Sequence, residues 1–365
     1  MTLRQRIEAV FRGEKPDAMV WFGDLTYWYA SHSTIGDVPE RWRGPGGIER
    51  LHRELNVGEY VPGCCAYDAI EDESVKVETE TRDGVRTVWR RTPVGTLREV
   101  REYSPVSFSS GFIEHPAKTV EDLKVVRYIE ARRRYRACPE KIAQVDRDYG
   151  DFGLPIVAVP ATPLAELYKS WVGLIELSYL MADAPAEVEK TIEVMTASQD
   201  ALYRITEESA CPYVMMCENL SAESMGGFFD RYAGPYLTRR TAALHARGKK
   251  TIIHIDGTLR GVVEKIPQTG IDCIDAMTPK PVGDVGVDEI RDLVGERLLI
   301  LGGLPGAMFA PPFGAREVER HVREIIRIHK DSGRFMLGVA DQVPPNGDLN
   351  LVRLISDLVE EYGRY

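Results

Sequence analysis

The second half of the chain alternates between short apolar runs and helical stretches, and this alternation limits the folds open to it. Such runs between helices indicate βα units and a parallel sheet. An earlier run lies at 19–25 (MVWFGDL), and an eighth β unit is expected around residues 55–70. The later runs occupy residues 154–161, 213–219, 249–257, 271–278, 297–304 and 334–341.

Two sheet architectures fit this pattern, an open doubly wound sheet and a closed eight-stranded barrel. No GxGxxG motif follows the first run, which argues against a dinucleotide-binding open sheet. Polar residues end nearly every predicted strand, and a barrel places its active site at the carboxyl ends of its strands. The predicted fold class is therefore α/β, as a (β/α)8 TIM barrel. The polar residues are Asp24, Glu218, Asp256, Asp275 and Asp341.

An antiparallel β flap interrupts the barrel pattern at about residues 71–104. Asp83 and Gly84 separate two β-type runs, which is a strong hairpin signal. Residues 92–100 (TPVGTLREV) are a third strand candidate, and an N-terminal helix is expected from Leu3 to Arg12. The 365 residues fall within the range of one barrel, about 200 to over 400. We therefore expect a single domain over residues 1–365 with the flap inserted.

Composition and charge exclude several classes of protein. Apolar residues make up 44% of the chain, which is too many for a disordered protein. The net charge of −10 repels phosphate backbones, so nucleic acid is not an expected partner. No apolar run approaches the roughly 20 residues that span a bilayer. The opening lacks a signal-peptide core, and the six cysteines form no CxxC pair. A cytoplasmic protein with reduced cysteines is expected.

His254 and Asp256 are the sharpest candidates for chemistry. Side chains alternate along a strand, so both point the same way near the end of the run at 249–257. They could be two metal ligands, or a general base oriented by a carboxylate; a buried hydrogen bond at the barrel mouth is the structural alternative. Glu218 and Asp341 could join them, and such a group would require a metal, a shared proton or a basic substrate. Oxygen-rich ligation with one histidine suits Mg, Mn or Zn. Capping of a following helix or loop explains the two added carboxylates equally well.

Substrate-binding candidates lie after the first and the penultimate strand. Backbone amides around Gly303 could hold an anionic group, although a tight turn that needs glycine explains them as well. Aromatic side chains in 21–29 could line a pocket for a flat or methylated ligand, and core packing is the alternative. The candidates in this segment are Asp24, Trp21, Tyr27, Trp28 and Tyr29.

Several segments resemble one enzyme superfamily. The opening LRQRIEAVFRGEKPDAMVW resembles the start of the uroporphyrinogen decarboxylase superfamily. TPVGTL and HPAKTVEDLKVVRYI resemble its methyltransferase-like, corrinoid-linked branch, and ELSYLMADAPAEVEKTIEVM resembles its central helices. HIDGTLRGVVEKIPQTGIDCID and GRFMLGVADQVPPNGDLNLVRLISDLVEEYG resemble its two closing motifs. Together these segments span nearly the whole chain, and the resemblance implies a (β/α)8 barrel.

The resemblance also implies a metal site, in which two of the family's ligands are replaced in this sequence. Corrinoid-linked methyltransferases bind zinc through a His-x-Cys pair and a later Cys. Here His254 matches the histidine, while Asp256 and Asp341 stand at the two cysteine positions. Zinc is the first expected metal, with Mg or Mn as harder alternatives, bound by His254, Asp256 and Asp341. Metal-free acid–base catalysis by His254 with Asp256 stays open.

The activity implied first is demethylation of a small methylated compound, with transfer to a thiol or to a corrinoid carried by a partner protein. His254, Asp256 and Asp341 would carry it, and Glu218 would assist. The alternatives are decarboxylation of uroporphyrinogen or a smaller acid, and a non-catalytic ligand-binding barrel. The decarboxylase's paired arginines and Phe-Ser-Asp motif do not occur. Related barrels are often dimers, so a homodimer is implied.

Overall fold

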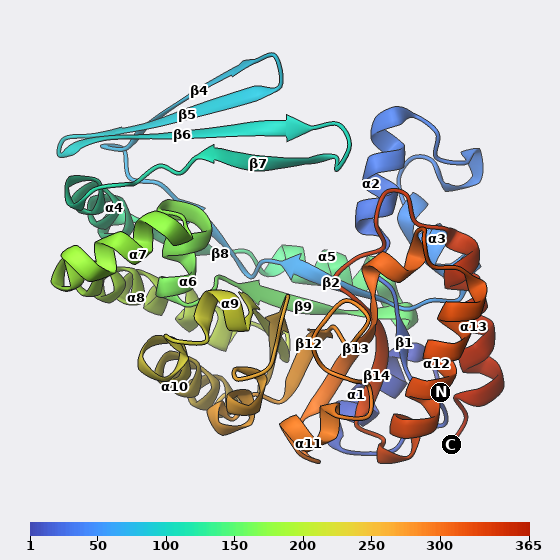
Figure 1. Ribbon diagram of the computed structural model, residues 1–365. Helices are drawn as coiled ribbons and strands as arrows, with labels where there is room; N and C mark the ends of the chain where they lie inside the picture. Colours follow the sequence, from blue (N-terminus) through green and yellow to red (C-terminus); the bar gives the residue numbers. More distant parts are fainter. The chain divides into compact units, whose positions relative to one another are not determined.

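The computed structural model describes residues 1–365, except for the side chains of residues 60–63. The chain divides into two compact units (Figure 1). The barrel unit comprises Met1–Cys65, Glu140–Ala158 and Ala210–Tyr365, and the second unit comprises Ala66–Pro139 and Val159–Ser209. A single domain over residues 1–365 stays a prediction, because units defined by their contacts need not fold separately.

The barrel unit is built on an eight-stranded sheet. Its strand order is β1 (Trp21–Phe22), β14 (Phe335–Ala340), β13 (Leu299–Pro305), β12 (Cys273–Met277), β11 (Lys250–Ile255), β10 (Tyr213–Leu220), β9 (Gly153–Val159) and β2 (Glu59–Cys64). Every strand pair with a defined register is parallel. β2 is the eighth β unit expected within residues 55–70. The predicted α/β barrel is therefore confirmed.

A short parallel bridge joins the two ends of this sheet. It pairs Phe22 with Gly58, just before β2. The Gly58 amide donates to the carbonyl of Trp21, and the Gly23 amide donates to that of Gly58, both over 3.1 Å. A Cβ on Gly58 would lie 2.9 Å from the Trp21 oxygen, so only glycine allows this approach. β1 is shorter than the predicted 19–25, because only Trp21 and Phe22 pair with β14 and the Met19 amide donates to the Gly363 carbonyl instead.

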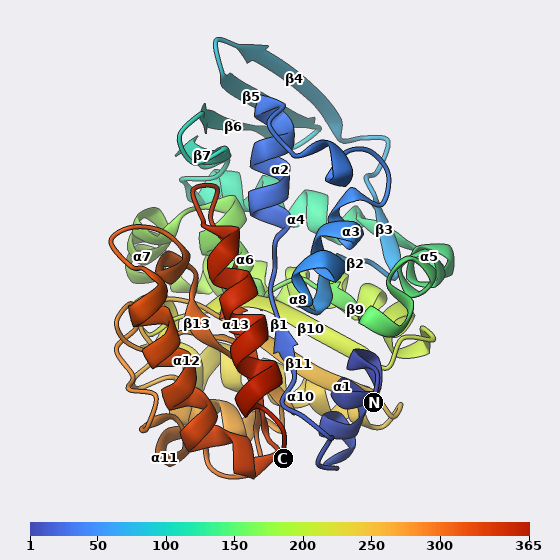
Figure 2. The same cartoon turned by 90° about the vertical axis from the view of Figure 1, so that its right-hand side faces the viewer.

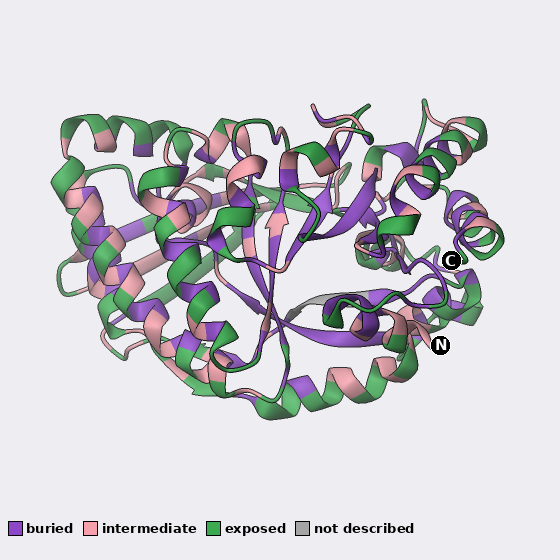
Figure 3. Cartoon of the chain, turned by 90° about the horizontal axis from the view of Figure 1, so that it is seen from below, coloured by how far each residue is buried: buried purple, intermediate pink, exposed green. Residues whose placement is uncertain are grey.

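The strands carry the core of this unit, and Figure 3 shows them largely buried. Every residue of β9, β13 and β14 is buried. Burial on both faces explains why each reads as a near-continuous apolar run. The helices of the unit are α1 (Leu3–Arg12), α2 (Thr26–Ile35), α3 (Gly47–Leu55), α5 (Pro139–Tyr149), α9 (Ala222–Met225), α10 (Gly234–His245), α11 (Ile290–Val294), α12 (Ala315–His329) and α13 (Leu349–Tyr362).

The two ends of the chain lie close together in the barrel unit (Figure 2). Ala18 and Arg364 form an antiparallel bridge. Helix α1 begins with a capping box, in which the Thr2 side chain accepts from the Gln5 amide and the Gln5 side chain bonds back. This motif satisfies two backbone amides that the first turn leaves open, and α1 spans the predicted residues.

The second unit contains the predicted flap as a four-stranded antiparallel sheet. It runs in the order β4 (Lys76–Arg82), β5 (Val85–Thr92), β6 (Gly95–Ser104) and β7 (Ser109–Glu114). Asp83 and Gly84 connect β4 and β5 with φ of 50° and 78°, as a tight hairpin turn requires. The sheet extends beyond residue 104, because β7 adds a strand that the pattern of 71–104 did not include.

Helices complete the second unit. They are α4 (Val120–Arg132), α6 (Pro163–Glu166), α7 (Leu174–Asp183) and α8 (Pro185–Glu208), and β3 (Tyr67–Ile70) pairs with β8 (Arg134–Ala137). Thr119 caps α4 and pairs with Asp122 in a capping box. In the part of the chain that the structure describes, no helix has the length and apolarity needed to cross a membrane.

Candidate active site

Polar side chains gather at the carboxyl ends of the strands in the barrel unit. Because these strands are parallel and adjacent, their carboxyl ends lie on one side of the sheet. Asp24 follows β1, Glu218 lies in β10, His254 in β11 and Asp275 in β12, while Asp256 and Asp341 directly follow β11 and β14. The structure thus brings the predicted polar residues to one end of the barrel.

His254 and Asp275 form the central pair of this site. They are register partners on neighbouring strands, and Nδ1 of His254 lies 2.6 Å from Oδ2 of Asp275. The His254 side chain is 15% exposed and that of Asp275 only 1%. A carboxylate acceptor fixes the proton on Nδ1. No described residue hydrogen-bonds to Nε2, so the second ring nitrogen is available to a substrate.

The neighbouring carboxylates favour the protonated imidazole. Burial by itself lowers the pKa of His254, but the hydrogen bond to Asp275 and the negative charges of Asp275, Asp341 and Asp256 raise it above 6.5 overall. The site therefore favours the imidazolium form of His254 more than water does. Such an imidazolium can donate a proton from Nε2.

The carboxyl groups of Asp24 and Asp341 both have raised pKa values. Burial raises the pKa of Asp24, although hydrogen bonds from Thr26 and Gln342 oppose the rise. Partial desolvation raises the pKa of Asp341, the positive charge of His254 lowers it, and Asp256, Asp24 and Asp275 raise it further. Asp341 therefore interacts with His254, and Asp24 interacts with Asp341 and Asp275.

Unusual backbone angles accompany the site. Asn219, Ala276 and Asp341 have φ of 48°, 63° and 68°. This left-handed conformation costs a non-glycine residue about 1–2 kcal/mol. Each of the three lies at the carboxyl end of a strand, and Asn219 and Ala276 directly follow Glu218 and Asp275. The strain is thus concentrated where the polar side chains are placed, a common feature of functional sites.

Asp256 and Glu218 were both expected to lie beside His254, but neither is its hydrogen-bond partner. Asp256 is exposed, and its Oδ1 accepts from the Gly257 amide over 2.8 Å, so the carboxylate bonded to His254 is that of Asp275. Glu218 is fully buried, in a stretch where the register of β10 with β11 shifts. Sequence reasoning noticed Asp275 as a strand-end residue but did not assign it to the site.

The predicted metal ligands His254, Asp256 and Asp341 do not form a metal cluster. Asp256 is exposed, and its Oδ1 accepts from the Gly257 amide of its own turn. Throughout the described residues, no group of three or more His, Cys, Asp and Glu side chains is arranged to hold a metal ion. The side chains present therefore do not fit the zinc, Mg or Mn site that the resemblance implies, and no step below uses a metal.

Trp28, Tyr29 and Gly303 form hydrogen bonds within the fold, and their predicted role in substrate binding stays a prediction. Trp28 donates to the Gly347 carbonyl over 3.1 Å, and Tyr29 donates to the Trp42 carbonyl over 2.6 Å. Gly303 lies within β13 rather than in a turn, and its carbonyl lies 2.7 Å from His321 Nε2. Tyr27 is half-buried in α2.

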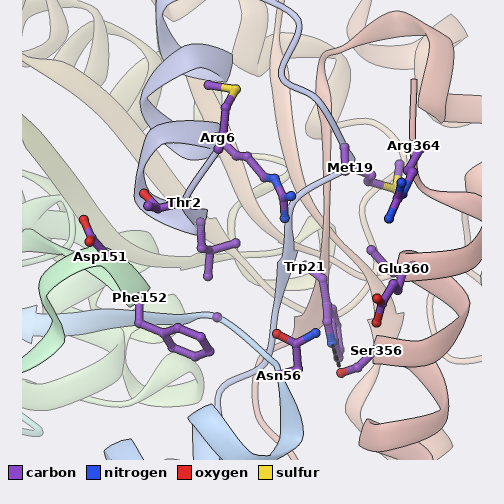
Figure 4. A pocket seen from close by; sticks show the side chains of 15 residues that line it. Thr2, Arg6, Met19, Trp21, Asn56, Asp151, Phe152, Ser356, Glu360 and Arg364 are labelled. Carbon is purple, nitrogen blue, oxygen red and sulfur yellow. Dashed lines mark hydrogen bonds between the residues drawn. The ribbon is translucent and has the colours of Figure 1, made fainter.

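Trp21 lies beside a separate cavity. Its Nε1 donates to Ser356 of α13 over 3.0 Å (Figure 4). The cavity has a volume of about 460 Å³ and is also lined by Met19, Asn56 and Gly58. These residues precede β1 and β2, so the cavity lies at the amino ends of the strands. It is therefore not part of the polar site at the carboxyl ends.

Comparison with known proteins identifies the family. Residues 111–362 match the family model described as uroporphyrinogen decarboxylase (URO-D), which is more than half of the chain. The chain belongs to the uroporphyrinogen decarboxylase family. The resemblance drawn from its motifs is thereby confirmed, and no curated protein matches this URO-D family member in sequence.

Two solved structures are similar to this chain to different degrees. A methyltransferase from Methanosarcina mazei has a TM-score of 0.63 and 13% identity, over 99% of both chains. A D-psicose 3-epimerase from Clostridium cellulolyticum H10 has a TM-score of 0.35 and 9% identity, over 62% of this chain and 83% of that one. The first similarity shows a shared fold, and the second is too weak to support an argument.

Proposed function

We propose that this URO-D family member is a methyltransferase-like enzyme that demethylates a small methylated compound. The pairing of His254 with Asp275 carries the proposal, because it provides a positioned proton donor at the carboxyl end of a barrel. The fold shared with a methyltransferase over 99% of both chains supports the choice of reaction.

The proposed step breaks the bond between the methyl carbon and a heteroatom of the substrate. The acceptor's electron pair forms the new bond to the methyl carbon, and the electrons of the broken bond remain on the heteroatom. His254 gives the Nε2 proton to that heteroatom and becomes neutral. Asp275 holds the ring and stabilises its charge before transfer, as a buried carboxylate does for a catalytic histidine. The acceptor is the thiolate form of a thiol, which has already lost its proton to solvent, or a corrinoid carried by a partner protein, which would supply a strong nucleophile when bound.

The remaining polar residues have supporting roles in this proposal. Asp341 and Asp256 maintain the protonated form of His254 through their charges. Asp24 and Tyr27 contact the substrate, and Glu218 shapes the base of the site. A substrate rich in carboxylates is disfavoured, because like charges at the strand ends repel it. This electrostatic effect argues against porphyrinogen decarboxylation.

The test is methyl transfer by the purified full chain. A panel of O-, N- and S-methyl compounds is incubated with cob(I)alamin or with a free thiol, and the demethylated product is measured by mass spectrometry. His254→Ala should lower the rate by about 100-fold or more, the usual contribution of a general acid. Release of CO2 from uroporphyrinogen without any methyl transfer would support decarboxylation instead.

A second histidine–aspartate pair in the barrel unit provides the control. His245 Nε2 lies 2.7 Å from Asp272 Oδ2, and Asp272 precedes β12, at the amino ends of the strands. His245→Ala removes a pair of similar length without touching the site and should leave the rate unchanged. Equal losses in both variants would refute the role of His254. Absence of any product from the whole panel would favour a non-catalytic barrel.

A further inference from the structure

The cavity beside Trp21 has the size of a small-molecule site. Its volume of about 460 Å³ falls within the range of about 300–1,000 Å³ that ligand pockets occupy. Segments of the barrel unit that are far apart in the sequence line it (Figure 4). The cavity lies at the amino ends of the strands, so the proposed methyl transfer at His254 does not use it.

The apolar wall of the cavity is held in place by its surroundings. The side chains of Met19 and Trp21 are 1% and 3% exposed, so close packing holds both. The Ser356 hydroxyl also fixes the indole of Trp21, because it accepts from Nε1 over 3.0 Å and donates to the Leu55 carbonyl over 2.7 Å. Half-buried Phe152 adds a second aromatic ring to the lining. Such a preformed wall suits an apolar or aromatic group of a ligand, because little has to rearrange on binding.

Charged groups of both signs accompany this wall. Asp151, Glu360 and Arg364 line the cavity and are exposed. Among the residues that the structure describes, none forms an ion pair or a hydrogen bond with these three side chains. Arg6 and the amino terminus also line the cavity, but Asp17 binds both, the guanidinium over 2.7 and 3.1 Å and the amino group over 3.0 Å. The described lining therefore leaves a guanidinium and two carboxylates for a ligand.

A ligand with both charges matches this lining better than an ion of one sign. A carboxylate can form two parallel hydrogen bonds with the guanidinium of Arg364. An ammonium donates up to three hydrogen bonds, which the carboxylates of Glu360 and Asp151 can accept. A purely anionic ligand would meet two like charges, and a purely cationic one would meet Arg364. Free α-amino acids with an apolar side chain combine both charges with a group that fits the aromatic wall.

We infer that the cavity beside Trp21 is a binding site for a free apolar or aromatic α-amino acid. The carboxylate of the ligand binds Arg364, its ammonium group binds Glu360, and its side chain lies against the aromatic wall. The inference does not rest on the proposed function, because the cavity and the site of His254 lie at opposite ends of the strands.

The first test is isothermal titration calorimetry of the full chain with four probes. L-Phenylalanine should bind. L-Phenylalaninamide lacks the carboxylate, N-acetyl-L-phenylalanine lacks the ammonium group, and glycine lacks the apolar side chain. Each of these three should bind at least about fivefold more weakly, because each has lost one recognised group. Binding of any of the three as tightly as L-phenylalanine, or no binding of L-phenylalanine, would overturn the inference.

The second test uses variants of exposed residues, which should leave the fold intact. Arg364→Gln should weaken the binding of L-phenylalanine by about fivefold or more but leave that of L-phenylalaninamide unchanged, because the amide has no carboxylate to lose. Glu360→Gln should show the same contrast between L-phenylalanine and its N-acetyl derivative. A general loss of structure would instead weaken every probe alike.

Arg353→Gln is the matched control. Arg353 is an exposed arginine of α13 that does not line the cavity, and its guanidinium lies 3.6 Å from Glu54. This variant should bind L-phenylalanine as the wild type does. Equal losses in Arg353→Gln and Arg364→Gln, or an undiminished affinity in Arg364→Gln, would overturn the inference.

Discussion

Oδ2 of Asp275 lies 2.6 Å from Nδ1 of His254, across two neighbouring parallel strands and at the same level of the sheet. This hydrogen bond joins the candidate proton donor to the carboxylate that orients it. The carboxylate is almost fully buried, so it can orient the imidazole without itself meeting solvent. The ring's second nitrogen remains available, which is the arrangement a proton donor requires.

Replacement of Asp275 by asparagine should move the pH dependence of activity. The pKa of His254 is raised in the folded protein, so its donor form persists to higher pH than that of a free histidine and disappears as the pH rises through the raised value. Loss of the Asp275 charge lowers that pKa, and the fall in kcat should begin at lower pH. The measurement is kcat against pH for both proteins. A fall at the same pH in both would contradict the assigned role of Asp275.

Asp256 should matter less than Asp275. Its carboxylate is exposed and caps Gly257, so only its charge reaches His254. Asp256→Asn should lower kcat by a few-fold, against roughly 10- to 100-fold for Asp275→Asn. Steady-state kinetics of the two variants under one set of conditions measures the difference. If the Asp256 variant proved the weaker enzyme, Asp256 would be the residue that directs His254.

Gly303→Ala should destabilise the fold without touching the site. Gly303 has φ of 97°, and an added Cβ would lie 3.0 Å from Phe335 and 3.1 Å from Ile325. Strained backbone together with overpacking should lower the free energy of unfolding by about 2–4 kcal/mol. Urea denaturation measures the loss, and Gly227→Ala, where a Cβ meets nothing within 4 Å, is the control. If Gly303→Ala lost affinity for the substrate while its stability stayed normal, the predicted role of Gly303 in substrate binding would be supported instead.

The sequence predicts those elements of the fold that are marked by an apolar run or by contacts between residues close in sequence. Strands buried on both faces, such as 335–340, read directly as apolar runs. The α1 capping box and the Asp83-Gly84 turn are local signals, and they mark real elements. β7 was missed because four of its six residues are exposed and it has no apolar run.

The site was harder to predict because it depends on pairing between strands. The alternation of side-chain directions along one strand predicted Asp256 as the partner of His254. The actual partner, Asp275, is fixed by the register between β11 and β12, which no spacing within one strand reveals. The position of Trp21 also depends on a contact that is remote in sequence. Its hydrogen-bond partner Ser356 lies 335 positions away, so the local sequence does not show which end of the barrel Trp21 faces.

A buried acid outside the site should make stability depend on pH. Glu59 is 2% exposed and accepts from the Tyr149 hydroxyl over 3.0 Å. Burial raises its pKa from 4.5 to about 8, so the folded state favours the protonated acid. Its contribution to stability is complete below pH 4.5 and is lost as the pH rises toward 8. Glu59→Gln removes this loss.

The stability of Glu59→Gln should therefore exceed that of the wild type at pH 8, by on the order of 2 kcal/mol, and equal it near pH 4.5. Urea denaturation at several pH values measures the difference. Buried His52 has its pKa lowered to about 4, and its Nε2 lies 3.8 Å from Glu59 Oε1. The comparison at pH 8, where His52 is neutral, is therefore the one that isolates Glu59. A difference independent of pH would show that Glu59 does not titrate in this range.

The most direct test of the account is the pKa of the His254 imidazole in the wild-type protein. The chain has seven histidines, so His254→Ala assigns the signal in an NMR titration of ¹⁵N-histidine-labelled protein. The account predicts a value above 6.5 in the wild type and a clear decrease in Asp275→Asn. A wild-type value at or below 6.5 that does not respond to Asp275→Asn would contradict the proposal that His254 is a proton donor held by Asp275.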